Sequence, residues 1–173
     1  LLGADEFDPS SLPKSAFVVY QGHHGDNGAH YADVILPSAA YTEKTATYVN
    51  TEGRAQLTRA VLSPPGAARE DWKIIRALSE FADFTLPYSD ISQLRSRMAD
   101  VSPTLVEYDS LTPSSTDLAA LSLRSLAAPS SASSTSNLSG AFTNLINNFY
   151  MTDPISRASK TMAKATAAFS KSH

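Results

Sequence analysis

The chain has 173 residues, of which 42% are hydrophobic and 18% are charged, with a formal net charge of -3. These values predict one globular domain and argue against a nucleic-acid-binding surface, which needs an excess of cationic side chains. The sequence contains no cysteine, so disulfides, thiolate nucleophiles and cysteine-ligated zinc or iron-sulfur clusters are excluded within this chain.

Short apolar segments typical of parallel strands open the chain. Residues 17–20 combine Phe, Val and Tyr before Gly22 and predict a buried strand, and Leu1-Leu2-Gly3 is interpreted as the end of another. The run at 33–37 predicts a further strand covered on both faces, because continuous apolar runs mark strands of parallel sheets. The pattern favours an α/β fold with a mainly parallel sheet.

A β-hairpin is predicted over about 46–62. Two segments rich in β-branched and aromatic residues, 47–49 and 56–61, flank the sequence Asn50-Thr51-Glu52-Gly53. Asn opens turns and Gly adopts positive φ without strain, so this tetrapeptide is expected to reverse the chain.

Two helices are predicted after the hairpin. Trp72, Ile75, Leu78 and neighbouring apolar residues recur at helical spacing, which predicts a helix at about 69–83. Asp90, followed three residues later by Gln93, has the form of a capping box and predicts a helix at about 90–100.

The middle of the chain has the composition of a linker. Residues 109–140 contain 11 serines, three charged residues and no aromatic residue. Such a segment buries too little apolar surface to offset the entropy of ordering its backbone. We therefore predict a partial α/β domain at 1–108, a largely irregular Ser/Ala-rich linker at 109–140 and a C-terminal docking segment at 141–173. Within the linker, residues 118–126 could form about two helical turns, which are marginal without a docking surface.

The docking segment is predicted to contain one amphipathic helix at about 154–170. Asp153 supplies an N-cap and Pro154 a first-turn proline. The apolar stripe comprises Ile155, Ala158, Met162, Ala165 and Phe169. The other face carries Arg157, Lys160, Lys164 and Lys171. A solvated basic face is the interpretation we favour over binding to a membrane surface or a partner.

Imidazole is concentrated in the segment 21–30, which contains His23, His24, His30 and Asp26. Three histidines and a carboxylate could complete a metal shell. Adjacent histidines diverge in regular structure, so His23 and His24 could share an ion only on an irregular loop. Hydrogen bonding to backbone or to a neighbouring residue is the commoner role. We predict no metal ligand, and a stand-alone metal-binding module remains an alternative.

Patterns for phosphate binding and nucleophilic catalysis are incomplete. Gly22, Gly25 and Gly28 are spaced by three and three, whereas the dinucleotide fingerprint needs glycines at relative positions one, three and six. Ser38 lacks the flanking glycines of a nucleophile elbow. No cofactor-binding or catalytic residue is predicted from either pattern.

Paired carboxylates also fail to define a catalytic site. Glu43 and Glu52 each lie beside a cation in the sequence, Lys44 and Arg54 respectively. Structural ion pairs are the commoner explanation for such neighbours. The predicted set of catalytic residues is therefore empty.

Several longer sequence motifs resemble those of a known protein family. These motifs are YQGHHGD at 20–26, ADVILP at 32–37, AYTEK at 40–44, ATYVNTEGRAQ at 46–56, REDWKIIRALSE at 69–80, FYMTD at 149–153 and ISRAS at 155–159. In this order they closely resemble the C-terminal part of the large iron-sulfur (seventy-five-kilodalton) subunits of respiratory complex I, NADH:ubiquinone oxidoreductase. The ADVILP motif and the hairpin also resemble the wider molybdopterin oxidoreductase superfamily.

The resemblance implies an α/β fold that lacks the molybdopterin cofactor. It further implies a structural segment of a subunit whose N-terminal region holds iron-sulfur clusters that pass electrons from NADH toward ubiquinone. The implied location is the matrix side of the mitochondrial inner membrane. The implied partners are the N-terminal part of the subunit and other subunits of the hydrophilic arm, without nucleic acid and without a membrane span. The alternative function is that of a molybdopterin-binding oxidoreductase fragment.

The predicted strands also suggest that the chain is incomplete alone. Leu1-Leu2-Gly3 and residues 17–20 look like members of a sheet whose other strands lie in sequence outside this chain. The first residues have neither an initiator Met nor a basic targeting segment. We expect either the C-terminal part of a longer subunit or a subunit made as two polypeptides.

Overall fold

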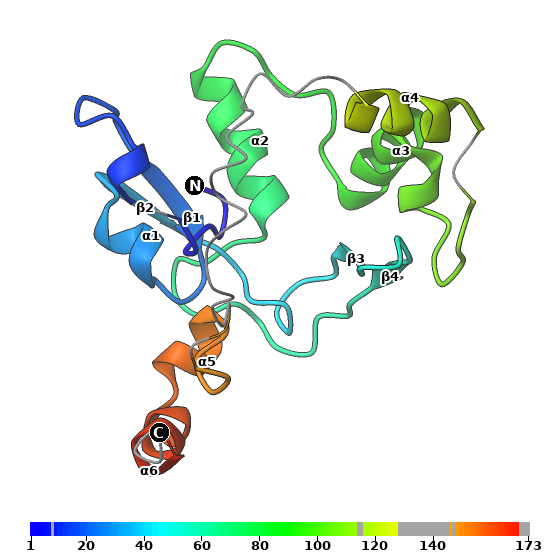
Figure 1. The fold of residues 1–173 in the computed structure, drawn as a ribbon. Coiled ribbons are helices and arrows are strands. Elements are labelled where there is room, and N and C mark those ends of the chain that lie inside the picture. The colour runs from blue at the N-terminus through cyan, green and yellow to red at the C-terminus, as the bar shows by residue number, and fades with distance from the viewer. Residues whose placement is uncertain (8, 114–115, 128–145, 147, 170–173) are drawn as a thin grey trace.

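The computed structural model describes residues 1–7, 9–113, 116–127, 146 and 148–169 (Figure 1). It is a mixed α/β structure, as predicted. The elements in chain order are η1 (Pro9–Ser11), β1 (Val19–Gly22), α1 (Asn27–His30), β2 (Val34–Pro37), β3 (Thr47–Val49), β4 (Ala55–Leu57), α2 (Asp71–Phe81), α3 (Ile91–Val101), η2 (Pro103–Leu105), α4 (Thr116–Ala127), α5 (Pro154–Ala158) and α6 (Lys160–Phe169). No helix within these described ranges is both long enough and apolar enough to cross a membrane.

A small parallel sheet is formed by the first segments of the chain. β1 and β2 pair in parallel with Val19 opposite Val34. The N-terminal residues add a parallel bridge on the other side of β1, between Leu2 and Gln21. There the Gln21 N–H donates to the Leu1 carbonyl at 2.9 Å. Leu1-Leu2-Gly3, predicted as the end of a strand, thus pairs with β1 through one isolated bridge and forms no strand of its own among the described residues.

The sequence predicted more burial for these strands than the structure has. The first strand begins at Val19 rather than at residue 17, and Phe17 is 73% exposed. The expectation that 33–37 is covered on both faces is wrong, because β2 lies at the edge of the pair and Ile35 is 53% exposed. Among the described residues, the outer side of β2 is paired only by a bridge from Ser38 to Arg69.

The hairpin prediction is confirmed by antiparallel pairing of β3 and β4, with Val49 opposite Ala55. The Asn50 side-chain oxygen accepts hydrogen bonds from the N–H groups of Glu52 and Arg54 at 3.1 and 3.0 Å. Gly53 has a φ of 87°, a conformation that side chains with a Cβ rarely adopt. The turn chemistry read from the sequence therefore determines the hairpin.

The two predicted helices are also present, as α2 and α3. The Asp90 carboxylate caps α3 by accepting from the N–H groups of Ser92 and Gln93 at 2.8 and 2.9 Å. The Gln93 side chain reaches back to the Ser89 N–H at 2.7 Å. Trp72 of α2 packs against Tyr88, with ring centroids 6.4 Å apart.

The later segments differ from expectation in their helices. Helix α4 covers 12 residues, more than the two turns considered possible within the linker. Residues 128–140 of the predicted linker lie outside the described residues. The single helix predicted at 154–170 is wrong, since Ser159 is extended with a ψ of 120° and separates α5 from α6. The Ser159 hydroxyl accepts from the Met162 N–H at 3.4 Å and starts a second helix.

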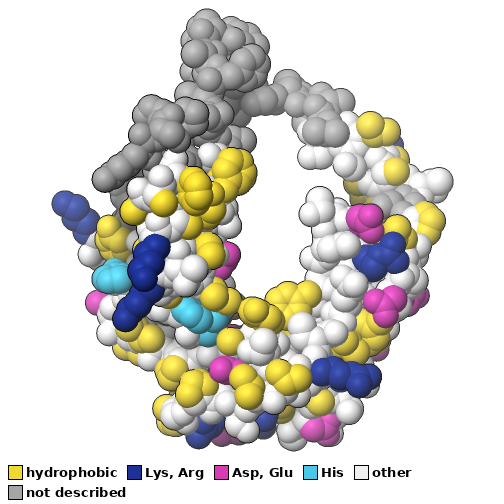
Figure 2. Space-filling view, turned by 90° about the horizontal axis from the view of Figure 1, so that it is seen from below, with side chains coloured by type: hydrophobic (Ala, Val, Ile, Leu, Met, Phe, Trp, Pro, Cys, Tyr) yellow, Lys and Arg dark blue, Asp and Glu magenta, His cyan; other side chains and the backbone are white. Residues whose placement is uncertain are grey.

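The buried core of the described residues is small. The hydrophobic side chains classed as buried there are Tyr20, Ala39, Ala55 and Ala68. Large apolar side chains remain on the surface, including Phe81, which is 88% exposed. Figure 2 shows hydrophobic side chains scattered over the face seen from below.

Candidate site at the carboxyl ends of the parallel strands

A crevice of about 300 Å³ opens where the parallel segments end. Gly3, Gly22 and Ser38 line it, each at or just after the carboxyl end of its strand segment. Open α/β sheets bind ligands in this position. The crevice is therefore the place at which chemistry should be sought.

An ion pair and a buried amide form the polar wall of the crevice. The Lys44 Nζ lies 2.5 Å from the Asp71 Oδ2 at the start of α2. Gln21 of β1, only 3% exposed, donates from Nε2 to the Asp71 Oδ1 at 2.9 Å. Burial raises the pKa of Asp71, but the hydrogen bonds from Lys44 and Gln21 outweigh it and hold that pKa below its usual value.

His23 lies beside this wall, immediately after β1. Burial lowers the pKa of His23, and the neighbouring His24 and Lys44 lower it further. The rings of His23 and His24 meet edge to face, with centroids 5.1 Å apart. The environment therefore favours a neutral imidazole at His23.

A second polar cluster is buried under α1. The Asp5 carboxylate accepts from the Tyr20 hydroxyl at 3.0 Å and from the Gly28 N–H at 2.9 Å. Burial, together with the hydrogen bond to Asp5, raises the pKa of Tyr20 to about 12. A Cβ at Gly28 would lie 2.5 Å from the Ala4 carbonyl oxygen. Gly28 therefore serves close packing of α1, and its N–H is already bound to a carboxylate of the chain.

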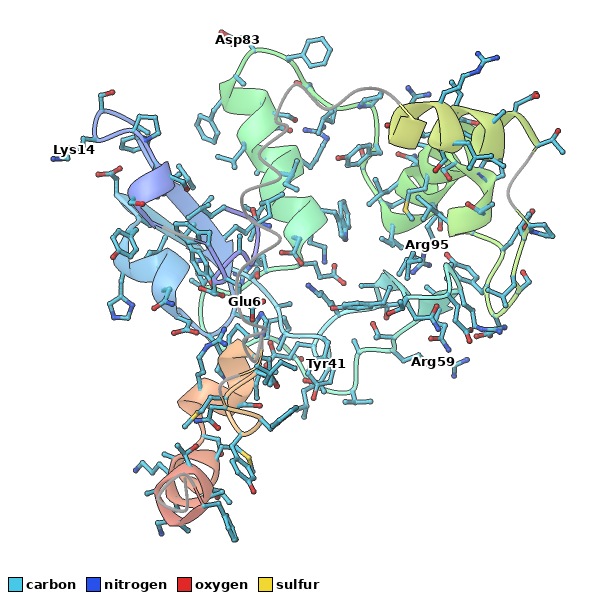
Figure 3. The ribbon with its side chains drawn as sticks, in the orientation of Figure 1. Glu6, Lys14, Tyr41, Arg59, Asp83 and Arg95 are labelled. Carbon is cyan, nitrogen blue, oxygen red and sulfur yellow. The ribbon has the colours of Figure 1, made fainter. Side chains whose placement is uncertain are left out.

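A wider groove of about 540 Å³ lies on the other side of His23. One wall of the groove is formed by His23, Tyr41, Tyr48 and Thr58. The other wall is formed by residues 153–156 at the start of α5. Tyr41 extends into the region between the hairpin and α5 in Figure 3. The C-terminal segment thus borders the same loop that forms the crevice.

Arg157 ties α5 to the N-terminal part of the chain. Its Nε donates to the Asp26 carboxylate, and its Nη2 lies 3.4 Å from the Glu6 Oε1. Its Nη1 donates to the Met151 carbonyl at 3.1 Å. The interpretation of Arg157 as part of a solvated basic face is therefore wrong.

The structure does not gather the histidine segment into a metal shell. The His30 Nδ1 lies 3.0 Å from the Asp26 carbonyl oxygen, while the Asp26 carboxylate faces Arg157. Within the described residues, no group of three or more His, Asp or Glu side chains is arranged to hold a metal ion. The rings of His23 and His24 contact each other edge to face.

The carboxylates weighed from the sequence have structural roles. Glu52 pairs with Arg54 at 3.3 Å, as expected. The expected pairing of Glu43 with Lys44 is wrong, because the Glu43 carboxylate accepts from the Ala40 N–H at 2.9 Å while Lys44 pairs across the crevice.

Ser38 is a buried strand-end residue rather than an exposed nucleophile. It is 4% exposed, and its N–H donates to the Gly22 carbonyl at 2.9 Å. Sequence reasoning missed Asp5, Asp71 and Arg157, because each acts on a residue distant along the chain. The excess of acid in residues 1–108, with 14 Asp and Glu against 9 Lys and Arg, does favour docking of the basic C-terminal segment on this part of the chain, but no sequence spacing singles out Arg157 as the contact.

Two protein-family models match separate parts of the chain. Residues 1–81 match the family described as molybdopterin oxidoreductase, in agreement with the parallel sheet and its crevice. Residues 110–165 match the family described as the C-terminal part of the G subunit of NADH-ubiquinone oxidoreductase.

Relatives make the identification more specific. The chain is 55% identical over 168 residues to the mitochondrial NADH-ubiquinone oxidoreductase 78 kDa subunit of Neurospora crassa. It is 48% identical over 174 residues to the mitochondrial NADH dehydrogenase (ubiquinone) iron-sulfur protein 1 of Solanum tuberosum. These alignments cover 97% and 99% of this chain but only 22% of each relative. The chain is thus similar to one part of the large iron-sulfur subunit of NADH-ubiquinone oxidoreductase, and it spans about a fifth of the length of these relatives.

The crevice residues do not fit a molybdopterin. That cofactor carries phosphate, which requires free cationic side chains or free backbone N–H groups. Lys44 is committed to Asp71, whose carboxylate also faces the crevice. The Gly28 N–H at the start of α1 is committed to Asp5. The crevice lysine and the helix-start N–H, two donors suited to a phosphate, are thus both bound to carboxylates of the chain.

Proposed function

We propose that this chain is a structural segment of NADH:ubiquinone oxidoreductase that folds and docks its subunit and carries out no chemistry itself. The clusters of the subunit would lie in its N-terminal region, and the assembled enzyme would hold this segment in the matrix-side arm at the mitochondrial inner membrane. The observation that carries the proposal is the 55% identity to a subunit of that enzyme over 97% of the chain.

The crevice supports a structural role. A ligand site presents polar groups that are free to bind a ligand. Here the Lys44 ammonium, the Asp71 carboxylate and the Gln21 amide bind one another. This network joins β1, the chain after β2 and α2, so its polar groups hold the fold together.

The exposed apolar side chains are evidence that a large partner covers this part of the chain. Four large apolar side chains are at least 70% exposed, namely those of Leu2, Phe17, Phe81 and Phe84. Single exposed apolar side chains are ordinary, but here they accompany a described core of only four buried hydrophobic side chains, which is small for a complete domain. The relatives are between four and five times as long as the aligned segment, so we propose that the N-terminal remainder of the same subunit covers these side chains. Other subunits of the arm would contact the completed domain.

The predicted division of the chain is retained as part of the proposal. Residues 1–108 would be the C-terminal part of a larger α/β domain, 109–140 a linker and 141–173 a docking segment. The second family match, at 110–165, spans the proposed boundary at 140. The linker and the docking segment would therefore belong to one unit of sequence that is shared across that family.

The rival functions are tested on the purified chain. We expect iron and zinc analysis, absorbance spectroscopy and extraction of oxidised pterin to find no stoichiometric group on the folded protein. A paramagnetic iron-sulfur signal would overturn the proposal. Extracted pterin would favour the molybdopterin-binding fragment, and one zinc per chain would favour a metal module built on His23, His24 and His30.

A further inference from the structure

We propose that residues 151–158 form a strap that is latched by Arg157 across the outside of the loop between β1 and α1, and that this strap holds the wall of the strand-end crevice in place. The inference goes beyond the proposed function and does not depend on whether the crevice holds a ligand. Figure 1 shows α5 lying beyond the carboxyl ends of β1 and β2.

Helix α5 is too short to be stable by itself. It has five residues, and helices much shorter than about 12 residues are marginal in water without external contacts. The Asp153 carboxylate caps its start by accepting from the N–H groups of Ile155 and Ser156, both at 2.9 Å. A cap alone contributes too little to hold one turn of helix, so the contacts of α5 with the N-terminal part must stabilise it.

Arg157 binds three separate segments of the chain at once. Its three guanidinium nitrogens contact three separate segments, represented by Asp26, Glu6 and the Met151 carbonyl. Asp26 and Glu6 precede Arg157 by 131 and 151 positions. The contact with Met151 folds the strap on itself, and the contacts with the carboxylates attach it to the N-terminal part. Figure 3 shows Glu6 beside α5.

The contact between Arg157 and Asp26 lies on the loop that shapes the crevice. Asp26 closes the segment 23–26, and His23 at its start lines both the crevice and the groove bordered by α5. Fixing Asp26 from outside therefore restrains His23, which lines both spaces.

The break at Ser159 confines the strap to its own short segment. Because the backbone there is extended, α6 takes a direction of its own and packs against its own C-terminal segment through Phe169 and Tyr150, whose ring centroids are 6.0 Å apart. The latch is consequently a property of residues 151–158 and does not require α6 to dock on the N-terminal part.

The test is hydrogen exchange on the full-length subunit in its assembled enzyme, comparing Arg157→Met with Lys160→Met. Lys160 is the matched control, since it is a nearby cation on the exposed side of α6. We expect Arg157→Met to accelerate exchange about tenfold or more in both 151–158 and 22–27, because charge-assisted hydrogen bonds are lost. Lys160→Met should leave both segments unchanged.

A charge exchange separates the latch from simple misfolding. Arg157→Asp combined with Asp26→Arg should restore most of the protection that either single variant loses, while the exchange of α2 stays constant throughout. Acceleration confined to 151–158 would show that the strap does not hold the loop and would overturn the inference. Equal effects of the Arg157 and Lys160 variants would also overturn it, whereas discovery of a bound pterin would overturn only the proposed function.

Discussion

The buried bond between Tyr20 and Asp5 allows a quantitative test of how the sheet is attached to α1. Replacing Tyr20 with Phe removes the hydroxyl that donates to Asp5 at 3.0 Å and keeps the buried ring. A hydrogen bond to a charged group contributes about 1.5 to 3 kcal/mol. The loss should increase local opening of this region by about 10- to 150-fold, because each 1.4 kcal/mol corresponds to about a tenfold change.

The assay is hydrogen exchange of peptides covering β1 and α1, with α3 as an internal reference. Asp5→Ala should destabilise the same peptides more strongly, because it also leaves the Gly28 N–H without its acceptor. The double variant should cost little more than Asp5→Ala alone, because both changes remove the bond between Tyr20 and Asp5. Tyr41→Phe is the control, since this half-exposed tyrosine should change stability by less than about 0.5 kcal/mol. Strictly additive effects, or equal acceleration in α3, would refute the reasoning.

Three further predictions concern charges. Below a pH of about 6.5, His23 becomes protonated in the unfolded chain, whereas its environment in the folded chain lowers its pKa and resists protonation. The free energy of unfolding should therefore fall from pH 7 toward pH 5. His23→Gln should flatten this pH dependence in thermal melts, and an unchanged slope would contradict the prediction. Lys44→Met should cost about 1 to 2 kcal/mol in urea unfolding, reduced by the partial exposure of Asp71, and a gain in stability would contradict the network. Asp90→Ala should cost about 1 kcal/mol and speed exchange in the first turn of α3 alone.

Elements defined by neighbouring residues could be predicted from the sequence. The hairpin turn depends on Asn50 and Gly53, and the start of α3 depends on Asp90, so each signal lies within a few residues of its effect. The break at Ser159 was missed, because the apolar spacing from Ile155 to Phe169 continues through one extended residue.

The site could not be predicted in the same way. Gln21 binds Asp71, which is 50 positions away in the sequence, and Arg157 binds Asp26, which is 131 positions away. The spacing of neighbouring residues contains no information about contacts over such separations. Burial was overestimated at β2 for a related reason. A run of apolar residues indicates that both faces of a strand are buried, but the residues that bury them can lie in sequence outside this segment.

The central claim is that this segment supports the subunit without taking part in electron transfer. Its most direct test is NADH:ubiquinone turnover per assembled enzyme in the Lys44→Met and Asp71→Asn variants, measured beside the amount of enzyme assembled. The account predicts less assembled enzyme with unchanged turnover for each molecule that assembles. Normal assembly with a turnover reduced tenfold or more would contradict it.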